Sequence, residues 1–171
     1  MKILIYPSEI LSTKAKPVNE LNTRLLKLVE DMFETMYKAK GIGLAANQVG
    51  VLQQVVVIDI GQRGEDAKPN PIVLINPVIT AAEGEICDVE GCLSVPEYFE
   101  KVKRAERIQV SAYDSKGKEI RMEANGLLAR CIQHELDHLN GICFVDRLSP
   151  LKKVFFRKKW AKLCRNSASK E

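Results

Sequence analysis

The sequence predicts an α+β domain in which mixed or antiparallel strands surround a central helix with an H-E-x-x-H motif, followed by a basic C-terminal helix. Segments with helical spacing of apolar residues lie toward both ends of the chain, and runs rich in β-branched residues lie between them. The 171 residues contain no repeat and no long linker, so we expect them to fold around one core.

The first half of the chain alternates between strand and helix signals. Residues 2–6 form an apolar run that predicts a short strand. Apolar residues recur at helical spacing from Leu21 to Lys40, and Gly41 fits the stop of that helix. The β-branched run at 55–60 predicts a buried strand, and the polar residues at 61–71 predict a loop.

The second half begins with strands and ends with helices. Residues 72–75 and 78–82 predict two further strands. Residues 108–113 and 119–122 flank the turn 114–117, which predicts a hairpin.

Two helices complete the prediction. The first runs from about residue 124 to 140 and is stopped by Gly141. The second is basic and follows Pro150.

Composition excludes several protein classes. The hydrophobic fraction of 46% and the charged fraction of 28% are ordinary for a globular protein and exclude disordered, collagen-like and fibrous chains. No apolar run approaches the 18 residues of a membrane span, and the N-terminal run stops at Pro7, too early for a secretory signal. We therefore expect no membrane association and a cytoplasmic location.

Positive charge is concentrated at the end of the chain. Residues 150–171 hold eight basic side chains and one acid, a net charge of +7, whereas the whole chain carries only +4. Such asymmetry indicates contact with a polyanion, most commonly nucleic acid, or else a solvated helix face.

The five cysteines also bear on function. An odd number in a chain expected to be cytoplasmic disfavours a disulfide framework and favours a metal-binding or catalytic role for one or two of them. The others fit small buried hydrophobic residues.

The only two histidines lie in the H-E-x-x-H motif, His134 to His138. At positions i and i+4 of a helix, both imidazoles project from one face and can bind one metal ion. Glu135 lies beside that face, where it can take a proton from a metal-bound water. The motif therefore predicts a catalytic metal centre.

The residues alone leave the third metal ligand open. Phe144 stands where the extended form of the motif places a third histidine. Asp146 lies downstream, and the upstream candidates are cysteines: Cys131 on the same helix, Cys92 and Cys87. Gly91 permits close backbone approach beside Cys92, which ranks it modestly above Cys87.

Three segments in order resemble the peptide deformylase family, which carries G-x-G-x-A-A-x-Q, E-G-C-L-S and H-E-x-x-H. They stand here as Gly41–Gln48, Glu90–Ser94 and His134–His138. The resemblance covers about residues 1–150 and implies hydrolytic removal of the formyl group from the N-terminal formyl-methionine of nascent polypeptides. It also implies that residues 1–149 form the catalytic deformylase domain and that 150–171 are a basic helix or tail appended to it.

The resemblance implies a role for each matching residue. Cys92, His134 and His138 would hold one divalent metal ion, Fe²⁺, with Zn²⁺ also able to occupy the site. Glu135 would act as general base and then as general acid. The Gln48 side-chain amide and the Leu93 backbone N–H would donate to the developing oxyanion.

A methionine side chain requires an apolar pocket. We expect five residues to bind substrate: Ile42, Gly43, Gly91, Leu127 and Cys131. Arg130 stands where the family often has an apolar residue, and we expect its stem to cover the pocket while its guanidinium reaches solvent.

The basic helix carries an apolar stripe at i, i+4 and i+7, made of Phe156, Trp160 and Leu163. The stripe predicts packing against the domain. The surrounding lysines predict docking on ribosomal RNA, through its phosphates, as nascent chains emerge.

Two other functions fit part of the sequence. A zinc peptidase would use the H-E-x-x-H motif with Asp146 as third ligand. A non-catalytic, metal-stabilised protein could bind RNA or the ribosome through its basic tail.

Overall fold

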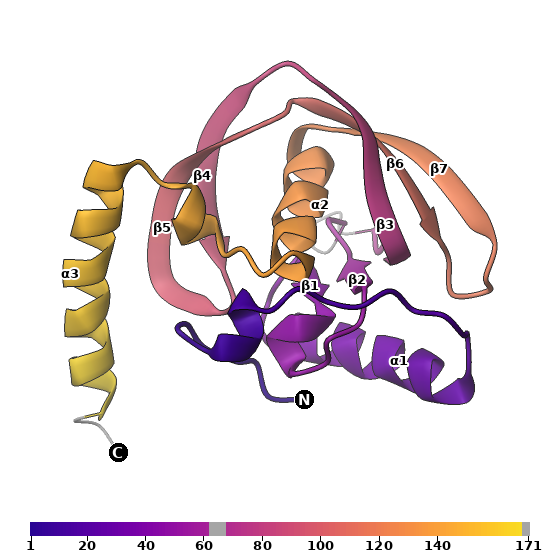
Figure 1. Cartoon of the computed structure of the whole chain (residues 1–171), viewed down its shortest axis with the longest axis horizontal. Coiled ribbons are helices and arrows are strands. Elements are labelled where there is room, and N and C mark those ends of the chain that lie inside the picture. Colours follow the sequence, from indigo (N-terminus) through magenta and orange to yellow (C-terminus); the bar gives the residue numbers. More distant parts are fainter. Residues whose placement is uncertain (62–67, 169–171) are drawn as a thin grey trace.

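A computed structural model describes residues 1–61 and 68–168 (Figure 1). Helix α2 (Gly126–Leu139) stands at the centre, with strands on more than one side of it (Figure 1). Among the described residues the strands form two sheets, and neighbouring strands in each sheet are antiparallel. The predicted α+β class, with strands around the helix that carries the histidines, is confirmed.

Five strands form the larger sheet, in the order β1-β2-β3-β6-β7. They are β1 (Gly43–Ala45), β2 (Val55–Ile58), β3 (Ile72–Glu83), β6 (Arg107–Tyr113) and β7 (Glu119–Asn125). A separate ribbon pairs β4 (Ile86–Cys92) with β5 (Val95–Arg104). The remaining elements are α1 (Thr23–Lys38), α3 (Pro150–Ala168) and the 3-10 helices η1 (Glu9–Ser12), η2 (Ala46–Val49) and η3 (Phe144–Arg147).

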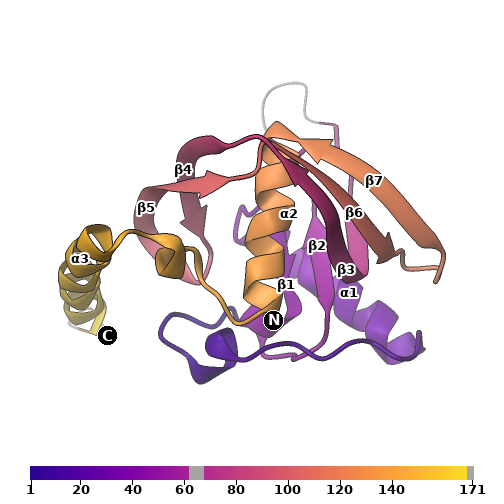
Figure 2. The ribbon, with the colours of Figure 1, turned by 45° about the horizontal axis from the view of Figure 1, so that its top comes forward.

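Strand β2 is buried on both faces, which explains its unbroken run of β-branched residues. Successive side chains of a strand point to opposite faces. Val55 and Val57 pack in a cluster with α1, whereas Val56 and Ile58 pack in a cluster with α2. The two helices thus cover opposite faces of this part of the sheet (Figure 2).

Helix α1 begins at a side-chain cap and ends before the predicted stop. The Asn22 side chain accepts a hydrogen bond from the Leu25 amide at 3.0 Å. The helix ends at Lys38, and Lys40, with φ of 56°, takes the left-handed conformation instead of Gly41. A Cβ at Gly41 would lie 2.7 Å from Leu93 Cδ1, so the Leu93 side chain would have to move to accommodate it.

Two strand predictions were wrong in detail. Residues 2–6 form no strand, because their amides bond to separate elements: Leu4 donates to Gln48 and Tyr6 to Ser94. The predicted strands at 72–75 and 78–82 are one strand, β3, with an irregular register at Asn76, whose φ is 51°.

The small-residue segment 41–50 holds strand β1 and the short helix η2, neither of which was predicted. Strands β4 and β5 were not predicted. Residues 62–67 of the predicted polar loop lie outside the described residues. Asp59 fixes both ends of that loop, since its Oδ1 accepts from the amides of Gly61 and Asn70 at 3.0 and 3.1 Å.

The other elements are confirmed. Strands β6 and β7 form the predicted hairpin, and α2 spans all but the ends of the predicted helix. Gly141 follows α2 with φ of 75°, as a glycine stop requires. Within the described part of the chain, no helix has the length and hydropathy needed to cross a membrane.

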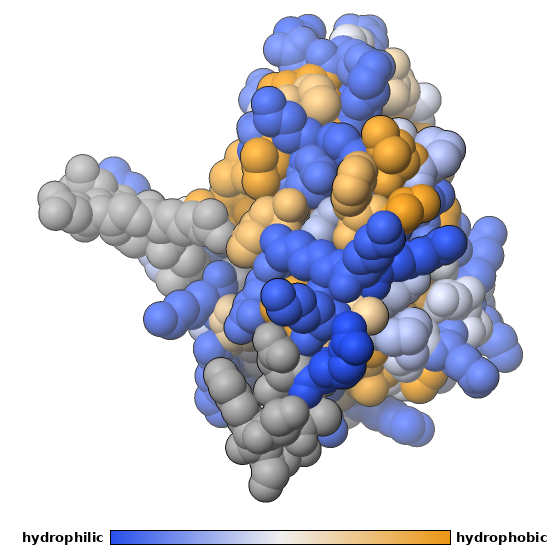
Figure 3. All heavy atoms as spheres, turned by 90° about the vertical axis from the view of Figure 1, so that its left-hand side faces the viewer, coloured by the Kyte–Doolittle hydropathy of each residue, from blue (hydrophilic) through white to orange (hydrophobic). Residues whose placement is uncertain are grey.

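Helix α3 packs through its predicted apolar stripe. Phe156 and Trp160 are buried in a cluster with Tyr98 and Val145, and the Phe156 ring lies 4.8 Å from that of Tyr98, centroid to centroid. The opposite face of the helix is exposed and rich in basic residues. Figure 3, which looks onto this side of the molecule, shows hydrophilic side chains gathered below hydrophobic patches.

Replacing Phe156 by alanine should therefore destabilise the protein. Phe156 is 3% exposed, whereas its neighbour Phe155 is 60% exposed. We expect Phe156→Ala to lower the free energy of unfolding in urea by about 3–5 kcal/mol, because it leaves a cavity under α3. Phe155→Ala, the matched control, should change it by less than about 0.5 kcal/mol. Equal effects of the two substitutions would contradict the packing.

Candidate metal centre and active site

Two elements bring three metal-ligating side chains together. His134 and His138 lie one turn apart on the buried face of α2, with ring centroids 4.9 Å apart. Cys92 ends strand β4, and its Sγ lies 3.1 Å from His138 Nε2. The ligand atoms of all three residues lie within 4.8 Å of one another. A thiolate and two imidazoles at this separation fit a divalent transition metal.

The orientation of His134 is fixed by a carboxylate. Its Nδ1 lies 3.0 Å from Glu90 Oε2, which leaves Nε2 free to bind a metal. A carboxylate behind a histidine ligand holds the ring in place and makes it a stronger ligand. Glu90 belongs to the E-G-C-L-S segment but was not predicted as a site residue.

Glu90 is held in turn by a buried cluster of charges. Both oxygens of Glu90 accept hydrogen bonds from Arg104 at 2.9 Å, through Nε and Nη2. Arg104 Nη1 donates to Asp137, which also accepts from Arg147 Nε at 2.9 Å. Asp137 lies on α2 between the two histidines, so Arg104 of β5 ties the ribbon to the helix.

The pKa values of Glu90 and Cys92 are lowered by the positively charged or hydrogen-bonding groups around them. Burial alone would raise the pKa of Glu90, but its bonds to Arg104 and His134 lower it to about 2. Burial would also raise the pKa of the Cys92 thiol, but the two imidazoles outweigh burial and hold that pKa well below its ordinary value. This shift favours the thiolate of Cys92, the form that binds metal. By contrast, burial raises the pKa of Cys143 to about 12.

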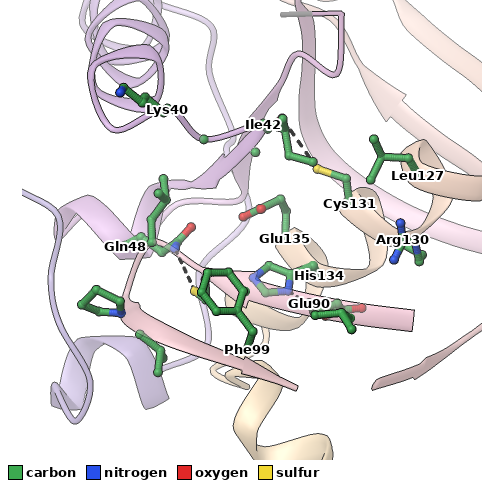
Figure 4. Close-up of a pocket in the computed structure, with 18 of the residues that line it drawn as sticks. Lys40, Ile42, Gln48, Glu90, Phe99, Leu127, Arg130, Cys131, His134 and Glu135 are labelled. Carbon is green, nitrogen blue, oxygen red and sulfur yellow. Dashed lines mark hydrogen bonds and ion pairs between the residues drawn. The ribbon is translucent and has the colours of Figure 1, made fainter. Parts of the chain in front are cut away.

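Gln48 lies against the cysteine ligand. Its Oε1 accepts from the Ala45 amide at 2.9 Å, and its Nε2 donates to Ser94 Oγ at 3.1 Å. The same Nε2 lies 3.6 Å from Cys92 Sγ (Figure 4). The Leu93 backbone stands between Cys92 and Ser94 in the turn that joins β4 to β5.

Glu135 is buried without a hydrogen-bond partner for one of its oxygens. Glu135 is 4% exposed, and among the described residues no group forms a hydrogen bond to its Oε2. Burial raises the pKa of Glu135 above its ordinary value. Its carboxylate points toward the space between Gln48 and His134 (Figure 4). A Cβ at Gly43 would clash with Glu135 Oε1, so only glycine fits there.

A cavity of about 500 Å³ opens beside these groups. All the residues predicted to bind substrate line it: Ile42, Gly43, Gly91, Leu127 and Cys131. A Cβ at Gly91 would lie 2.5 Å from the Phe99 ring, which sequence reasoning did not place in the cavity.

Arg130 also lines the cavity, and its guanidinium does not extend freely into solvent. The side chain is 15% exposed, and Nη1 lies 2.9 Å from Asp88 Oδ2 on strand β4. Pairing with Asp88 was not predicted.

The other candidates for third ligand have other surroundings in the described structure. Cys87 is exposed, and the Cys131 thiol lies 3.7 Å from the Ile42 carbonyl. Asp146 Oδ2 accepts from the Cys143 amide at 2.9 Å. The cluster that forms within residues 1–61 and 68–168 contains Cys92 alone of the four.

Removing the carboxylate behind His134 should weaken metal binding. Glu90→Gln keeps the shape of the side chain but loses the charge that orients and strengthens the ligand. We expect metal affinity, measured by competition with a chromophoric chelator, to fall about 10–100-fold.

Glu100 provides the matched control for this substitution. It pairs across the ribbon with Glu90 but bonds to Lys152 near the surface. Glu100→Gln should leave metal affinity unchanged. An unchanged affinity in Glu90→Gln, with the protein folded, would show that His134 needs no such support.

The chain is similar to known proteins over most of its length. A family model described as polypeptide deformylase matches residues 1–154. The chain is 52% identical over 160 residues to a peptide deformylase of Thermodesulfovibrio yellowstonii, covering 94% of this chain and 96% of the relative. It is 55% identical over 152 residues to that of Neisseria gonorrhoeae, covering 89% of each. A crystal structure of a peptide deformylase from Legionella pneumophila has a TM-score of 0.90 at 47% identity, covering 98% and 96%. The chain belongs to the polypeptide deformylase family.

Proposed function

We propose that this chain hydrolyses the N-formyl amide of nascent polypeptides that begin with formyl-methionine, using one metal ion held by Cys92, His134 and His138. The observation that carries the proposal is the convergence of these three ligands beside the buried carboxylate of Glu135, in a cavity of about 500 Å³. Formate and a free α-amine are the products.

The ligand set suits either of two metals. A thiolate with two imidazoles binds both Fe²⁺ and Zn²⁺, and we propose Fe²⁺, as the resemblance implies. A bound divalent ion supplies Lewis acidity, which lowers the pKa of water and polarises the formyl oxygen. Fe²⁺ beside a thiolate is sensitive to oxygen, so the protein requires anaerobic preparation.

Glu135 moves the proton in this mechanism. Its raised pKa and its unpartnered oxygen suit a group that accepts a proton from the attacking water. The protonated carboxyl then donates to the nitrogen of the leaving amine. One residue thus serves as base in the first step and as acid in the second.

Two donors beside Cys92 stabilise the oxyanion. The Gln48 amide is held by Ala45 and Ser94, and its contact with Cys92 Sγ is long at 3.6 Å. The Nε2–H group that faces Sγ can therefore donate to a substrate oxygen instead, because little hydrogen-bond energy is lost when this long contact breaks. The Leu93 backbone N–H is the second donor.

The cavity receives the methionine side chain. Ile42, Leu127 and Cys131 provide an apolar lining, and Gly43 and Gly91 let the substrate backbone come close. Glycine at these positions also keeps the carboxylate of Glu135 and the ring of Phe99 in place.

We also propose that the chain acts in the cytoplasm and docks on the ribosome through α3. Residues 1–149 form the catalytic domain, and 150–171 form a basic helix or tail appended to it. The packing of Phe156 and Trp160 leaves Arg157, Lys158 and Lys162 exposed for contact with RNA phosphates.

Family membership does not favour the two other functions considered from the sequence. A zinc peptidase with Asp146 as ligand would need that carboxylate, which is bonded to the Cys143 amide. A purely structural metal site would not need an unpartnered carboxylate like that of Glu135.

Substitution of Glu135 tests the catalytic proposal. Anaerobically prepared, Fe²⁺-loaded protein should release formate from a formyl-methionyl peptide, and Glu135→Gln should slow release about 10²–10⁴-fold with unchanged metal content. Glu97→Gln, on an exposed carboxylate that also lines the cavity, should retain activity. Absence of release by the metal-filled native protein would refute the function, and full activity of Glu135→Gln would refute its role.

Charge reversal on α3 tests docking. Lys158→Glu with Lys162→Glu should reduce co-sedimentation with ribosomes at low salt, because phosphate contacts are lost. Lys116→Glu with Lys118→Glu, in the β6–β7 turn, gives the same change in net charge at another surface and should have no effect. Equal co-sedimentation of both double variants and the native protein would exclude docking through α3.

A further inference from the structure

An ion pair stands in the wall of the active-site cavity. Arg130 belongs to α2 and Asp88 to β4, and Nη1 and Oδ2 lie 2.9 Å apart. The Arg130 side chain is 15% exposed, whereas that of Asp88 is 50% exposed. The positive charge of Arg130 is therefore largely enclosed in the cavity wall, next to the apolar residues Leu127 and Cys131.

The guanidinium of Arg130 has more N–H donors than the neighbouring residues have acceptors for it. It carries five N–H groups. Among the described residues Asp88 is its only ionic partner, and the contact joins Nη1 to Oδ2. Its Nε is enclosed and has no acceptor, so the accessible part of the side chain, 15% of it, lies elsewhere. Buried donors without partners are rare and call for an explanation. Because Arg130 lines the cavity, an N–H group on the accessible part of its guanidinium can donate to a ligand there.

The position of Arg130 fits contact with the end of a substrate side chain. It lies four residues before His134 on α2, about one helical turn or about 6 Å along the axis. A methionine side chain spans roughly the same length. Figure 4 shows Leu127, Arg130 and His134 following one another along the helix. Leu127, Arg130, Cys131 and His134 all line the cavity, so a first side chain bound there can contact Arg130.

We propose that Arg130 is a specificity-determining residue that donates a hydrogen bond to a neutral acceptor at the end of the first side chain, so that peptides beginning with formyl-methionine sulfoxide are also substrates. Asp88 balances the charge of Arg130, which favours a neutral acceptor over a carboxylate. A sulfoxide oxygen is a stronger acceptor than a thioether sulfur.

The reaction is unchanged by this contact. Water adds to the formyl carbon, the C–N bond breaks, and formate and a free amine leave, while the sulfoxide keeps its oxidation state. The proposal rests on the proposed function of the same site, so the formyl-methionyl peptide serves as internal reference.

The test compares kcat/KM for three peptides that differ only in the first residue: formyl-methionine, formyl-methionine sulfoxide and formyl-norleucine. Arg130→Met keeps the length of the side chain but removes its donors. We expect the sulfoxide-to-methionine ratio to fall at least about tenfold in Arg130→Met, the effect of one hydrogen bond to a charged group. The norleucine-to-methionine ratio should stay within about twofold, since neither side chain is a strong acceptor.

Arg107 provides the matched control, because it pairs with Glu123 at 3.5 Å on the exposed part of the sheet. Arg107→Met should leave both ratios unchanged. An unchanged sulfoxide ratio in Arg130→Met overturns the proposal. A parallel fall of the norleucine ratio, or a fall of the sulfoxide ratio in Arg107→Met, also overturns it by indicating a change of shape or of overall charge. Inactivity of the native protein toward formyl-methionine would refute the proposed function instead.

Discussion

The buried bonds of Arg104 are the constraint on which the site depends. The cysteine ligand comes from a ribbon and the histidines come from a helix. Arg104 joins them by bonding to Glu90 on one side and Asp137 on the other. A buried charge that loses its partner costs about 3–5 kcal/mol, so each member of the cluster holds the others in place.

Sequence reasoning predicted best what is encoded locally. The two histidines share a face because helical spacing puts them there, and the glycine after α2 has the left-handed conformation expected of a stop. The choice of Cys92 was different: spacing alone left four candidates open, and only the resemblance selected one. Its pairing with the helix spans more than forty residues of chain, so no local pattern could establish it.

The ribbon β4–β5 escaped prediction for a physical reason. Its buried positions include Glu90 and Arg104, which a hydrophobicity pattern interprets as solvent-facing. Each neutralises the other, so burial of both is tolerated although either alone would be costly. The pairing of Arg130 with Asp88 was missed for a different reason, because two charges far apart in sequence give no sign that they meet.

The ribbon has a further consequence for the lifetime of the bound ion. A two-stranded ribbon is marginally stable on its own, whereas α2 is enclosed by the main sheet. Local opening therefore costs less at β4–β5 than at the helix. Detachment of the ribbon would move the Cys92 thiolate away while both imidazoles stayed in place on α2. A metal ion held by these three residues would lose its thiolate ligand first, and amide hydrogen exchange in the hairpin should follow the same opening.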